Sequence, residues 1–214
     1  MKTIDVWKQK LKKIKNEGYT YVDIDNRRAK ELLNVIITIE DPKKQEIEGP
    51  LDYLSAQHKW LYPSKTEISN VMFKEILNPA YDYTYGGRIF NFADKFNQIN
   101  NFIIPLLKKQ PLTRAAVVSV YNPIEDSNFT NTNKPGIIML YFRIIEEKLT
   151  ISAVIRSQDF FFGWPANIYQ IYSLQKYVAE NLNVEIGSLT TLSNSTHIFE
   201  SNFEDINQLV QEEK

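Results

Sequence analysis

The segment from Arg156 to Asn167 carries the densest group of side chains suited to binding a polar ligand. Arg156 supplies a fork-shaped cation and Ser157 a hydroxyl donor, and both groups suit a phosphate. Asn167 carries a donor and an acceptor together, as reading the amide edge of a pyrimidine requires. The same segment opens the clearest predicted helix, whose first N–H groups are unpaired and favour negative charge. These residue types and this spacing predict a site for a phosphate or a carbonyl group.

A purely structural interpretation of these residues stays open. Asn167 would cap the helix, residues 163–165 would form a turn, and Arg156 would pair with Asp159. Downstream, His197 would be a core histidine bonded to a backbone carbonyl. Residue types and spacing alone are compatible with both interpretations.

The absence of cysteine excludes a whole class of chemistry. Without a thiol, the chain has no disulfide, no thiolate metal site and no cysteine nucleophile. The two histidines, His58 and His197, are too few for a three-histidine zinc site. The net charge of -1, from 25 basic and 26 acidic residues, argues against a protein that wraps nucleic acid.

Composition also bounds the kind of protein. With 43% hydrophobic and 13% aromatic residues, the chain can bury a sizeable core. No apolar run approaches the roughly 18 residues that a membrane span needs. The first five residues lack the apolar stretch of a secretory signal. We therefore expect a soluble, cytoplasmic protein.

The first 18 residues predict a basic amphipathic helix. Its apolar positions follow helical spacing, at Ile4, Trp7, Leu11 and Ile14, while five lysines between residues 8 and 15 take the other face. Gly18 is a natural end for this helix. A membrane-surface or nucleic-acid role is one interpretation, but we expect a solvated helix packed on the domain.

Further along the chain, strands and helices alternate as a mixed α/β domain requires. Apolar and β-branched runs predict strands over residues 32–40, 115–121, 137–145, 149–155 and 188–192. Helical spacing predicts helices over residues 51–61, 63–77, 94–109 and 167–182, and a short one from about residue 203. In the first of these strands, one face is expected to carry Leu33, Val35, Ile37 and Ile39. No repeat or linker divides the chain, so we expect one domain over residues 1–214.

The motif Arg156-Ser157-x-Asp159-x-x-x-Gly163-x-Pro165-x-Asn167, followed by His197-Ile198-Phe199, resembles the thymidylate synthase superfamily. Residues 30–34 and 39–42 resemble the amino-terminal strand of its shorter archaeal and pyrimidine-hydroxymethylase branches. Tyr85-Gly86 is similar to the Tyr-Gly turn of that family, and residues 113–122 are similar to its phosphate-arginine segment. The resemblance extends from about residue 25 to about residue 206.

This resemblance implies a three-layer α/β fold around a large mixed sheet, a two-fold homodimer and a bound pyrimidine nucleotide monophosphate. The phosphate would be held by Arg156, Ser157 and Arg114 of the partner subunit. Asn167 would read the ring, and an asparagine there goes with uracil rather than cytosine. His197 would reach the sugar 3′-hydroxyl.

Further residues take their expected roles from the same resemblance. Asp159 is similar to the aspartate that orients a folate cofactor, and Tyr85 and Trp60 resemble active-site aromatic residues. Arg27 or Arg28 is expected to take the place of the amino-terminal arginine of the family.

The departures from the family pattern concern the reacting groups. The nucleophilic cysteine aligns with Gly136, and no other residue of this chain supplies a thiolate. Two interpretations of this glycine stay open: a small residue where strands crowd, or an opening for a bulkier substituent at C5 or C6 of the ring. The general acid/base glutamate aligns with Gln57, and an amide does not exchange protons near pH 7. Phe199 replaces a tyrosine hydroxyl, worth about 0.5–1.5 kcal/mol, and Ala115 replaces one of two adjacent phosphate arginines.

The matches and departures leave three functions open. The first is a non-catalytic protein that binds a uracil-type pyrimidine nucleotide as a sensor or regulator. The second is an enzyme with altered chemistry, such as methyl or hydroxymethyl transfer to a pyrimidine nucleotide from a tetrahydrofolate derivative. Its nucleophile would be Ser157, Tyr85, His58 or His197, with Asp159 as base. The third is a scaffold that keeps only the fold and the dimer surface. We expect no metal, nucleic acid or membrane as a partner.

Overall fold

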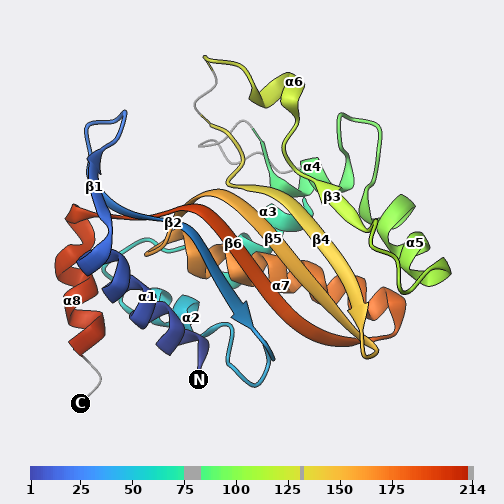
Figure 1. Cartoon of the computed structure of the whole chain (residues 1–214), viewed down its shortest axis with the longest axis horizontal. Helices are drawn as coiled ribbons and strands as arrows, with labels where there is room; N and C mark the ends of the chain where they lie inside the picture. The colour runs from blue at the N-terminus through green and yellow to red at the C-terminus, as the bar shows by residue number, and fades with distance from the viewer. Residues whose placement is uncertain (75–82, 131–132, 212–214) are drawn as a thin grey trace.

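The structure is a computed structural model that describes residues 1–74, 83–130 and 133–211. In these residues one six-stranded sheet forms the centre, with the strand order β1-β2-β6-β5-β4-β3 (Figure 1). The strands are β1 (Tyr19–Val22), β2 (Arg28–Ile39), β3 (Val117–Ser119), β4 (Ile137–Ile145), β5 (Lys148–Asp159) and β6 (Glu185–Phe199). Neighbouring strands are antiparallel except β5 and β6, which run parallel. The predicted mixed α/β class is confirmed.

The parallel pairing of β5 with β6 follows from the long helix that connects them. Helix α7 (Gly163–Leu182) carries the chain from the end of β5 back to the start of β6, as two parallel neighbours require. Its buried stripe includes Ile168 and Ile171, and the helix packs on both strands. The carboxyl ends of the two strands therefore lie together, with Asp159 opposite His197 in the register.

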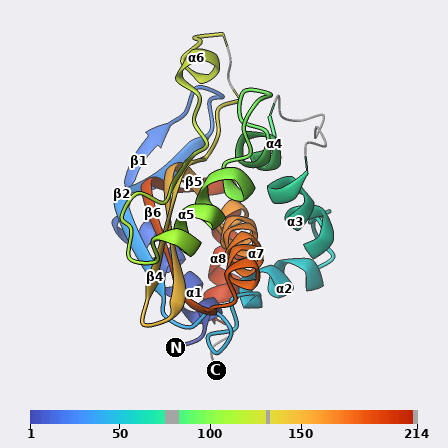
Figure 2. The same ribbon diagram turned by 90° about the vertical axis from the view of Figure 1, so that its right-hand side faces the viewer.

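The helices lie mainly on one side of the sheet (Figure 2). Helix α7 packs directly on the sheet, and α3 (Lys65–Phe73) packs on α7 from farther out, with α2 (Gly49–Ala56) also contacting α7. On the other face of the sheet, the described residues leave the side chains exposed or half-buried, as at Tyr141, Val154 and Leu192. The sheet thus has one face buried by helices and one face largely uncovered.

The amino-terminal helix α1 (Thr3–Glu17) packs on the domain, as predicted. Trp7, Leu11 and Ile14 are buried in the core. The Nε1 of Trp7 donates to the carbonyl oxygen of Phe160 at 2.8 Å, and its ring stacks on Phe161 with 5.7 Å between the ring centroids. The helix is therefore bound to the turn that follows β5.

The remaining helices are short. They are α4 (Tyr85–Phe90), α5 (Ile104–Lys109), α6 (Pro123–Asp126) and α8 (Phe203–Gln211), with a π-helical turn over Ile99–Ile103 and a 3₁₀ turn over Glu200–Asn202. The final helix confirms the prediction of a short helix from about residue 203. None of the described helices is both long enough and apolar enough to cross a membrane.

Some predicted helices differ in extent from the structure. The helix predicted over residues 51–61 is α2, which ends at Ala56, two residues before the left-handed backbone of His58 (φ 53°). The helix predicted over residues 94–109 begins only at Ile99, because Ala93 and Asp94 adopt left-handed backbone conformations in a turn. Pro105 lies just after the π-helical turn over Ile99–Ile103, in the first turn of α5. The helix predicted over residues 63–77 is α3 as far as Phe73, and residues 75–77 lie outside the described residues.

Two predicted strands also differ. The strand predicted over residues 115–121 shortens to β3, whereas the one predicted over residues 188–192 is the much longer β6. In β2, Ile37 and Ile39 are buried as predicted, but Leu33 is 65% exposed. Asn34, directly after it, has a left-handed backbone (φ 55°) that interrupts the regular alternation of the two faces.

We expect Trp7→Ala to lower the free energy of unfolding by about 3–5 kcal/mol, because it removes a fully buried ring. Trp7→Phe keeps much of the ring but leaves the Phe160 carbonyl unpaired, for a loss of roughly 1–3 kcal/mol. Urea unfolding followed by circular dichroism measures both values.

Leu112→Ala is the control, because Leu112 is 80% exposed and its truncation should change stability by less than about 0.5 kcal/mol. Equal effects of Trp7→Ala and Leu112→Ala would contradict the assignment of α1 to the core.

Candidate functional site

A cavity of about 620 Å³ lies at the carboxyl end of β5, between α3, the start of α4 and the first turns of α7. Six of the positions singled out in the sequence line it: Tyr85, Gly136, Arg156, Ser157, Asp159 and Asn167. Open α/β sheets bind their ligands at the carboxyl ends of parallel strands. The topology of the sheet therefore collects residues from distant parts of the chain at the place where a ligand is expected.

Arg156 lies at this cavity with two of its donors already used. Its Nε donates to the carbonyl oxygen of Pro135 at 2.9 Å, and its Nη2 donates to that of Lys134 at 2.8 Å. A guanidinium has five N–H donors, so others remain for a ligand. Lys134 also lines the cavity. The cations of Arg156 and Lys134, with the hydroxyl of Ser157, make this part of the cavity suited to a phosphate.

The side chain of Asn167 is held by a neighbouring amide. Asn167 lies inside α7, which begins at Gly163, so the interpretation of Asn167 as the helix cap is wrong. Its Nδ2 donates to Oε1 of Gln158 at 3.0 Å. Gln158 is only 1% exposed, and its Nε2 donates to the backbone carbonyl of Asp159 at 2.8 Å.

Asp159 and His197 form a buried pair at the ends of β5 and β6. Oδ1 of Asp159 accepts from the N–H groups of Phe161 at 2.9 Å and Phe162 at 3.3 Å, which holds the turn into α7. Burial raises the pKa of the Asp159 carboxyl above its usual value, while His197 acts in the opposite direction. Burial lowers the pKa of His197, whose Nδ1 has no hydrogen-bond partner among the described residues. The site therefore favours a neutral imidazole.

The hydroxyl of Tyr85 lies beside Gly136. Its oxygen accepts a hydrogen bond from the N–H of Ile137 at 3.2 Å. A Cβ added to Gly136 would lie 3.2 Å from this hydroxyl and 3.4 Å from the carbonyl oxygen of Ser157, so a neighbour would have to move by a few tenths of an ångström. At Gly136, where the resemblance places the nucleophilic cysteine, the chain therefore offers no side chain, and the nearest side-chain group is the Tyr85 hydroxyl.

The other residues singled out in the sequence lie outside the cavity wall. Gln57 and His58 are exposed at the end of α2, and Trp60 packs edge-on against two phenylalanines of the turn before α7. Arg114 is exposed on the segment before β3. His197 lies next to Asp159 in the sheet and does not line the cavity.

Arg27 approaches the carboxyl end of β6 from the β1–β2 hairpin. Its guanidinium lies over the ring of Phe199, 4.3 Å from the centroid, and pairs with Asp23 and Asp25. The Phe199 ring in turn lies edge-on to His197, with 5.2 Å between the centroids. Of the two arginines expected near the site, Arg27 is therefore held close to His197, whereas Arg28 pairs with Glu200.

Sequence reasoning missed several residues that line the cavity: Glu67, Asn70, Tyr83, Lys134, Gln158 and Gln170. The spacing Ser64-x-x-Glu67 is a recognisable capping box, and the structure confirms it at the start of α3. Hydrogen bonds from Ser64 lower the pKa of Glu67, so its carboxylate stays charged. A capping motif does not reveal which cavity a helix faces, so the sequence held no signal for this role.

Among the residues described, no three His, Asp or Glu side chains gather as metal ligands would.

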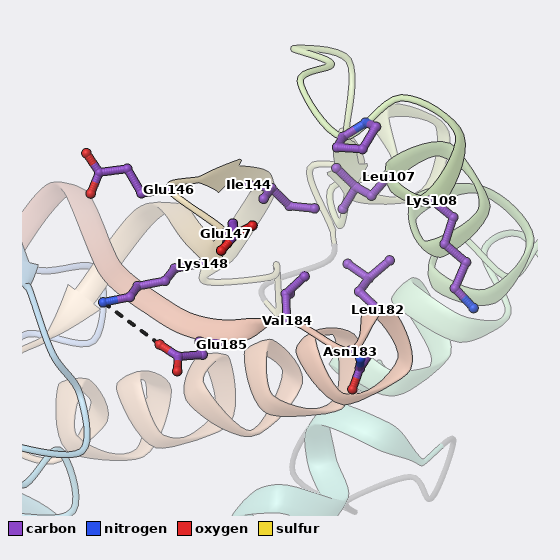
Figure 3. Close-up of a pocket in the computed structure, with 11 residues that line it drawn as sticks. Leu107, Lys108, Ile144, Glu146, Glu147, Lys148, Leu182, Asn183, Val184 and Glu185 are labelled. Carbon is purple, nitrogen blue, oxygen red and sulfur yellow. Dashed lines mark ion pairs between the residues drawn. The ribbon is translucent and has the colours of Figure 1, made fainter.

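A second cavity, of about 700 Å³, lies at the other end of the sheet (Figure 3). It is lined by the β4–β5 turn, α5, the end of α7 and the start of β6. Lys148 at the start of β5 and Glu185 at the start of β6 form an ion pair at 4.0 Å. Glu146 and Glu147 are exposed on the turn. These charged groups are open to solvent and do not converge on one point, so we assign no ligand to this cavity.

Comparison with known proteins shows which family the chain resembles along its length. The model of the thymidylate synthase family matches residues 7–214. A protein of Methanosarcina mazei named “Putative thymidylate synthase” is 30% identical over 97% of this chain and 91% of its own length. A protein of the same name from Methanosarcina barkeri is 29% identical over 98% and 93%. The “Deoxyuridylate hydroxymethyltransferase” of Bacillus phage SP01 is 31% identical over 81% of this chain and 51% of its own length.

The fold and the cavity define a class of protein: a mixed α/β domain with a cavity where β5 passes into α7. The chain belongs to the thymidylate synthase family, since the family model covers nearly its whole length. It departs from the chemistry expected of that resemblance because it has no cysteine.

We expect His197 to stay neutral at pH 6.5, because burial disfavours its charged form. In the unfolded chain the same ring protonates near pH 6.5. The unfolded state thus binds this proton more tightly, and the stability contributed by neutral His197 is complete above about pH 6.5 and falls as the pH drops below that value. A ¹⁵N NMR titration of the two imidazoles measures the midpoint.

The variant His58→Asn removes the other imidazole and so assigns the two sets of signals. A His197 midpoint above pH 6.5 would contradict the burial argument.

Proposed function

We propose that this protein binds a uracil-type pyrimidine nucleoside monophosphate in the cavity at the end of β5 and does not perform cysteine-dependent ring chemistry. The observation that carries the proposal is the convergence of Arg156, Ser157 and Asn167 on one cavity whose wall at Gly136 has no side chain. A cytoplasmic location, expected from the sequence, is part of the same proposal.

Charge supports the assignment of the phosphate to one part of the cavity. Arg156 and Lys134 are cationic, and Ser157 adds a hydroxyl donor. The hydrogen bonds from Arg156 to the two carbonyls before Gly136 hold its guanidinium in place before a ligand arrives. A pre-positioned fork of N–H groups loses little conformational entropy on binding an anion.

The base would lie against Asn167. Its amide retains one N–H and one carbonyl after the hydrogen bond to Gln158. These two groups match the C4 carbonyl and the N3–H of uracil. Glu67, on α3, also lines the cavity, and its carboxylate is ionised. Because it would repel a phosphate on that side, its charge favours a phosphate near Arg156.

The missing thiol supports the absence of the usual ring chemistry. A nucleophile must add to C6 of the ring before C5 can react, and this chain has no cysteine. The hydroxyl of Tyr85 lies next to the position that the cysteine side chain would occupy, but a neutral phenol is a poor nucleophile.

A second candidate is an enzyme that uses a nucleophile other than cysteine. The observation that favours it is the hydroxyl of Tyr85 beside Gly136. The phage relative carries the name of a deoxyuridylate hydroxymethyltransferase, and a tetrahydrofolate derivative would be the corresponding one-carbon donor. Turnover of dUMP with such a donor, abolished by Tyr85→Phe, would favour this candidate over binding alone.

We also propose that the protein is a homodimer formed through the uncovered face of the sheet. Apolar side chains on that face, including Val154 and Leu192, are only half-buried within one chain. Arg114 is exposed and does not reach the cavity of its own chain, so a second copy could place it near a phosphate. A two-fold contact would then complete two sites at once.

Isothermal titration calorimetry should show dUMP binding with a dissociation constant in the micromolar range, about -8 kcal/mol. Arg156→Ala should weaken binding roughly 10- to 100-fold, because a charge-assisted hydrogen bond is worth about 1.5–3 kcal/mol. Lys134→Ala should have a smaller effect in the same direction.

Lys148→Ala is the matched control, since this lysine pairs with Glu185 far from the cavity. If folded wild-type protein binds no dUMP, or if Arg156→Ala binds as well as wild type, the nucleotide proposal fails.

Light scattering after size exclusion should give twice the 25.0 kDa mass of one chain. Val154→Asp should yield a monomer, because a charge would be buried in the contact between two sheets. Asn16→Asp adds the same charge on the exposed side of α1 and should leave the dimer intact. A wild-type monomer, or a dimer that tolerates Val154→Asp, would contradict this proposal.

A further inference from the structure

We infer that Gln158 is a positioning residue that locks the orientation of the Asn167 amide and thereby makes the cavity select uracil over cytosine. The inference rests on the proposed nucleotide function and assigns base selectivity to the variable position between Ser157 and Asp159 of the motif that suggested that function. It follows from a chain of three polar groups that ends on the protein backbone.

The chain of hydrogen bonds has only one allowed direction. The backbone carbonyl of Asp159 can only accept, so the group of Gln158 that lies 2.8 Å from it must be the amide nitrogen. The oxygen of Gln158 then points the other way, toward Asn167. The atom of Asn167 that lies 3.0 Å from this oxygen must therefore be its nitrogen.

Reversing either amide would bring acceptors into contact. If Asn167 turned over, its carbonyl oxygen would face the oxygen of Gln158. If Gln158 turned over as well, its oxygen would face the Asp159 carbonyl. These oxygen–oxygen contacts would replace the hydrogen bonds that now measure 3.0 Å and 2.8 Å. Gln158 is buried, and an unpaired buried polar group costs about 1–3 kcal/mol. A backbone carbonyl cannot turn over, so the orientation of Asn167 is set from the backbone.

The locked amide leaves an ordered edge for a ligand. One N–H and the carbonyl oxygen of Asn167 stay available, and their order cannot be exchanged. Uracil offers an acceptor at C4 and a donor at N3, which match that order. Cytosine offers a donor at C4 and an acceptor at N3, and would need the reversed amide.

Packing around Gln158 supports a dedicated position for its amide. The residue is 1% exposed, although it is polar and lies next to a cavity. Gly163, the first residue of α7, lies directly against it, and a Cβ there would be only 3.0 Å from Nε2 of Gln158. A glycine at this position therefore leaves the room that the amide occupies.

The test compares calorimetric titrations with dUMP and dCMP for the full chain and three variants. Gln158→Met keeps the length of the side chain but frees the Asn167 amide, so we expect the preference for dUMP over dCMP to fall about tenfold. Gln158→Glu still accepts from Asn167, so we expect weaker binding of both nucleotides with the preference retained. Gln175→Met makes the same change at a second buried glutamine, which lies in α7 and donates to three backbone carbonyls outside the cavity. This variant should leave the preference unchanged.

A ligand-free NMR measurement tests the lock by itself. In wild type, one proton of the Asn167 side-chain NH₂ should exchange slowly with solvent, and Gln158→Met should abolish this protection while Gln175→Met preserves it. Asn167→Ser assigns the signal.

The possible outcomes separate this inference from the proposed function. A wild-type preference for dUMP that Gln158→Met leaves unchanged, or equal exchange of the Asn167 amide in both proteins, would overturn the role of Gln158 while the nucleotide site stands. Binding of neither nucleotide by wild type would overturn the proposed function, and base selection with it. Loss of the preference in Gln175→Met as well as in Gln158→Met would show a general packing effect and would also overturn the inference.

Discussion

The turn from Asp159 to Gly163 determines the geometry of the whole candidate site. Within a few residues the chain leaves a central strand and enters α7, and several polar groups of this turn are hydrogen-bonded. The carboxylate of Asp159 accepts from two N–H groups of the turn. The N–H of Phe160 donates to the carbonyl of His197 on β6, and its carbonyl accepts from Trp7 on α1. Because β6 and α1 both hold this turn, Ser157 and Asn167 are fixed on one cavity before a ligand binds.

The proposed function requires binding groups at the cavity but no thiolate. Catalysis and binding place different demands on a site, because only interactions specific to the transition state accelerate a reaction. Anion and amide recognition needs fixed donors and acceptors, which Arg156 and Asn167 supply. Covalent addition by the cysteine route of the family needs a thiolate, and this sequence has no cysteine.

Much of the fold and part of the site could be predicted from the sequence, for reasons that are local. Helix α7 and strand β4 carry strong periodic patterns, and the motif from Arg156 to Asn167 occupies one strand, one turn and one helix. The length of β6 could not be predicted, because its many serines and threonines weaken the apolar pattern that identifies a buried strand. Cavity residues such as Lys134 and Glu67 come from separate elements, and only tertiary packing brings them together. The alignment of Gln57 with an acid/base residue concerns an exposed position at the end of α2, outside the cavity wall.

The most direct test of a nucleotide site without ring chemistry is a proton NMR experiment on dUMP mixed with the protein in D₂O. Saturation of protein resonances should transfer to H5 and H6 of the base, which reports binding. The H5 intensity should then stay constant for hours, because deuterium replaces H5 only after a nucleophile adds to C6. Loss of the H5 signal would reveal covalent chemistry at the ring, and absence of saturation transfer would show that no nucleotide binds; either result would contradict the function proposed for this cavity.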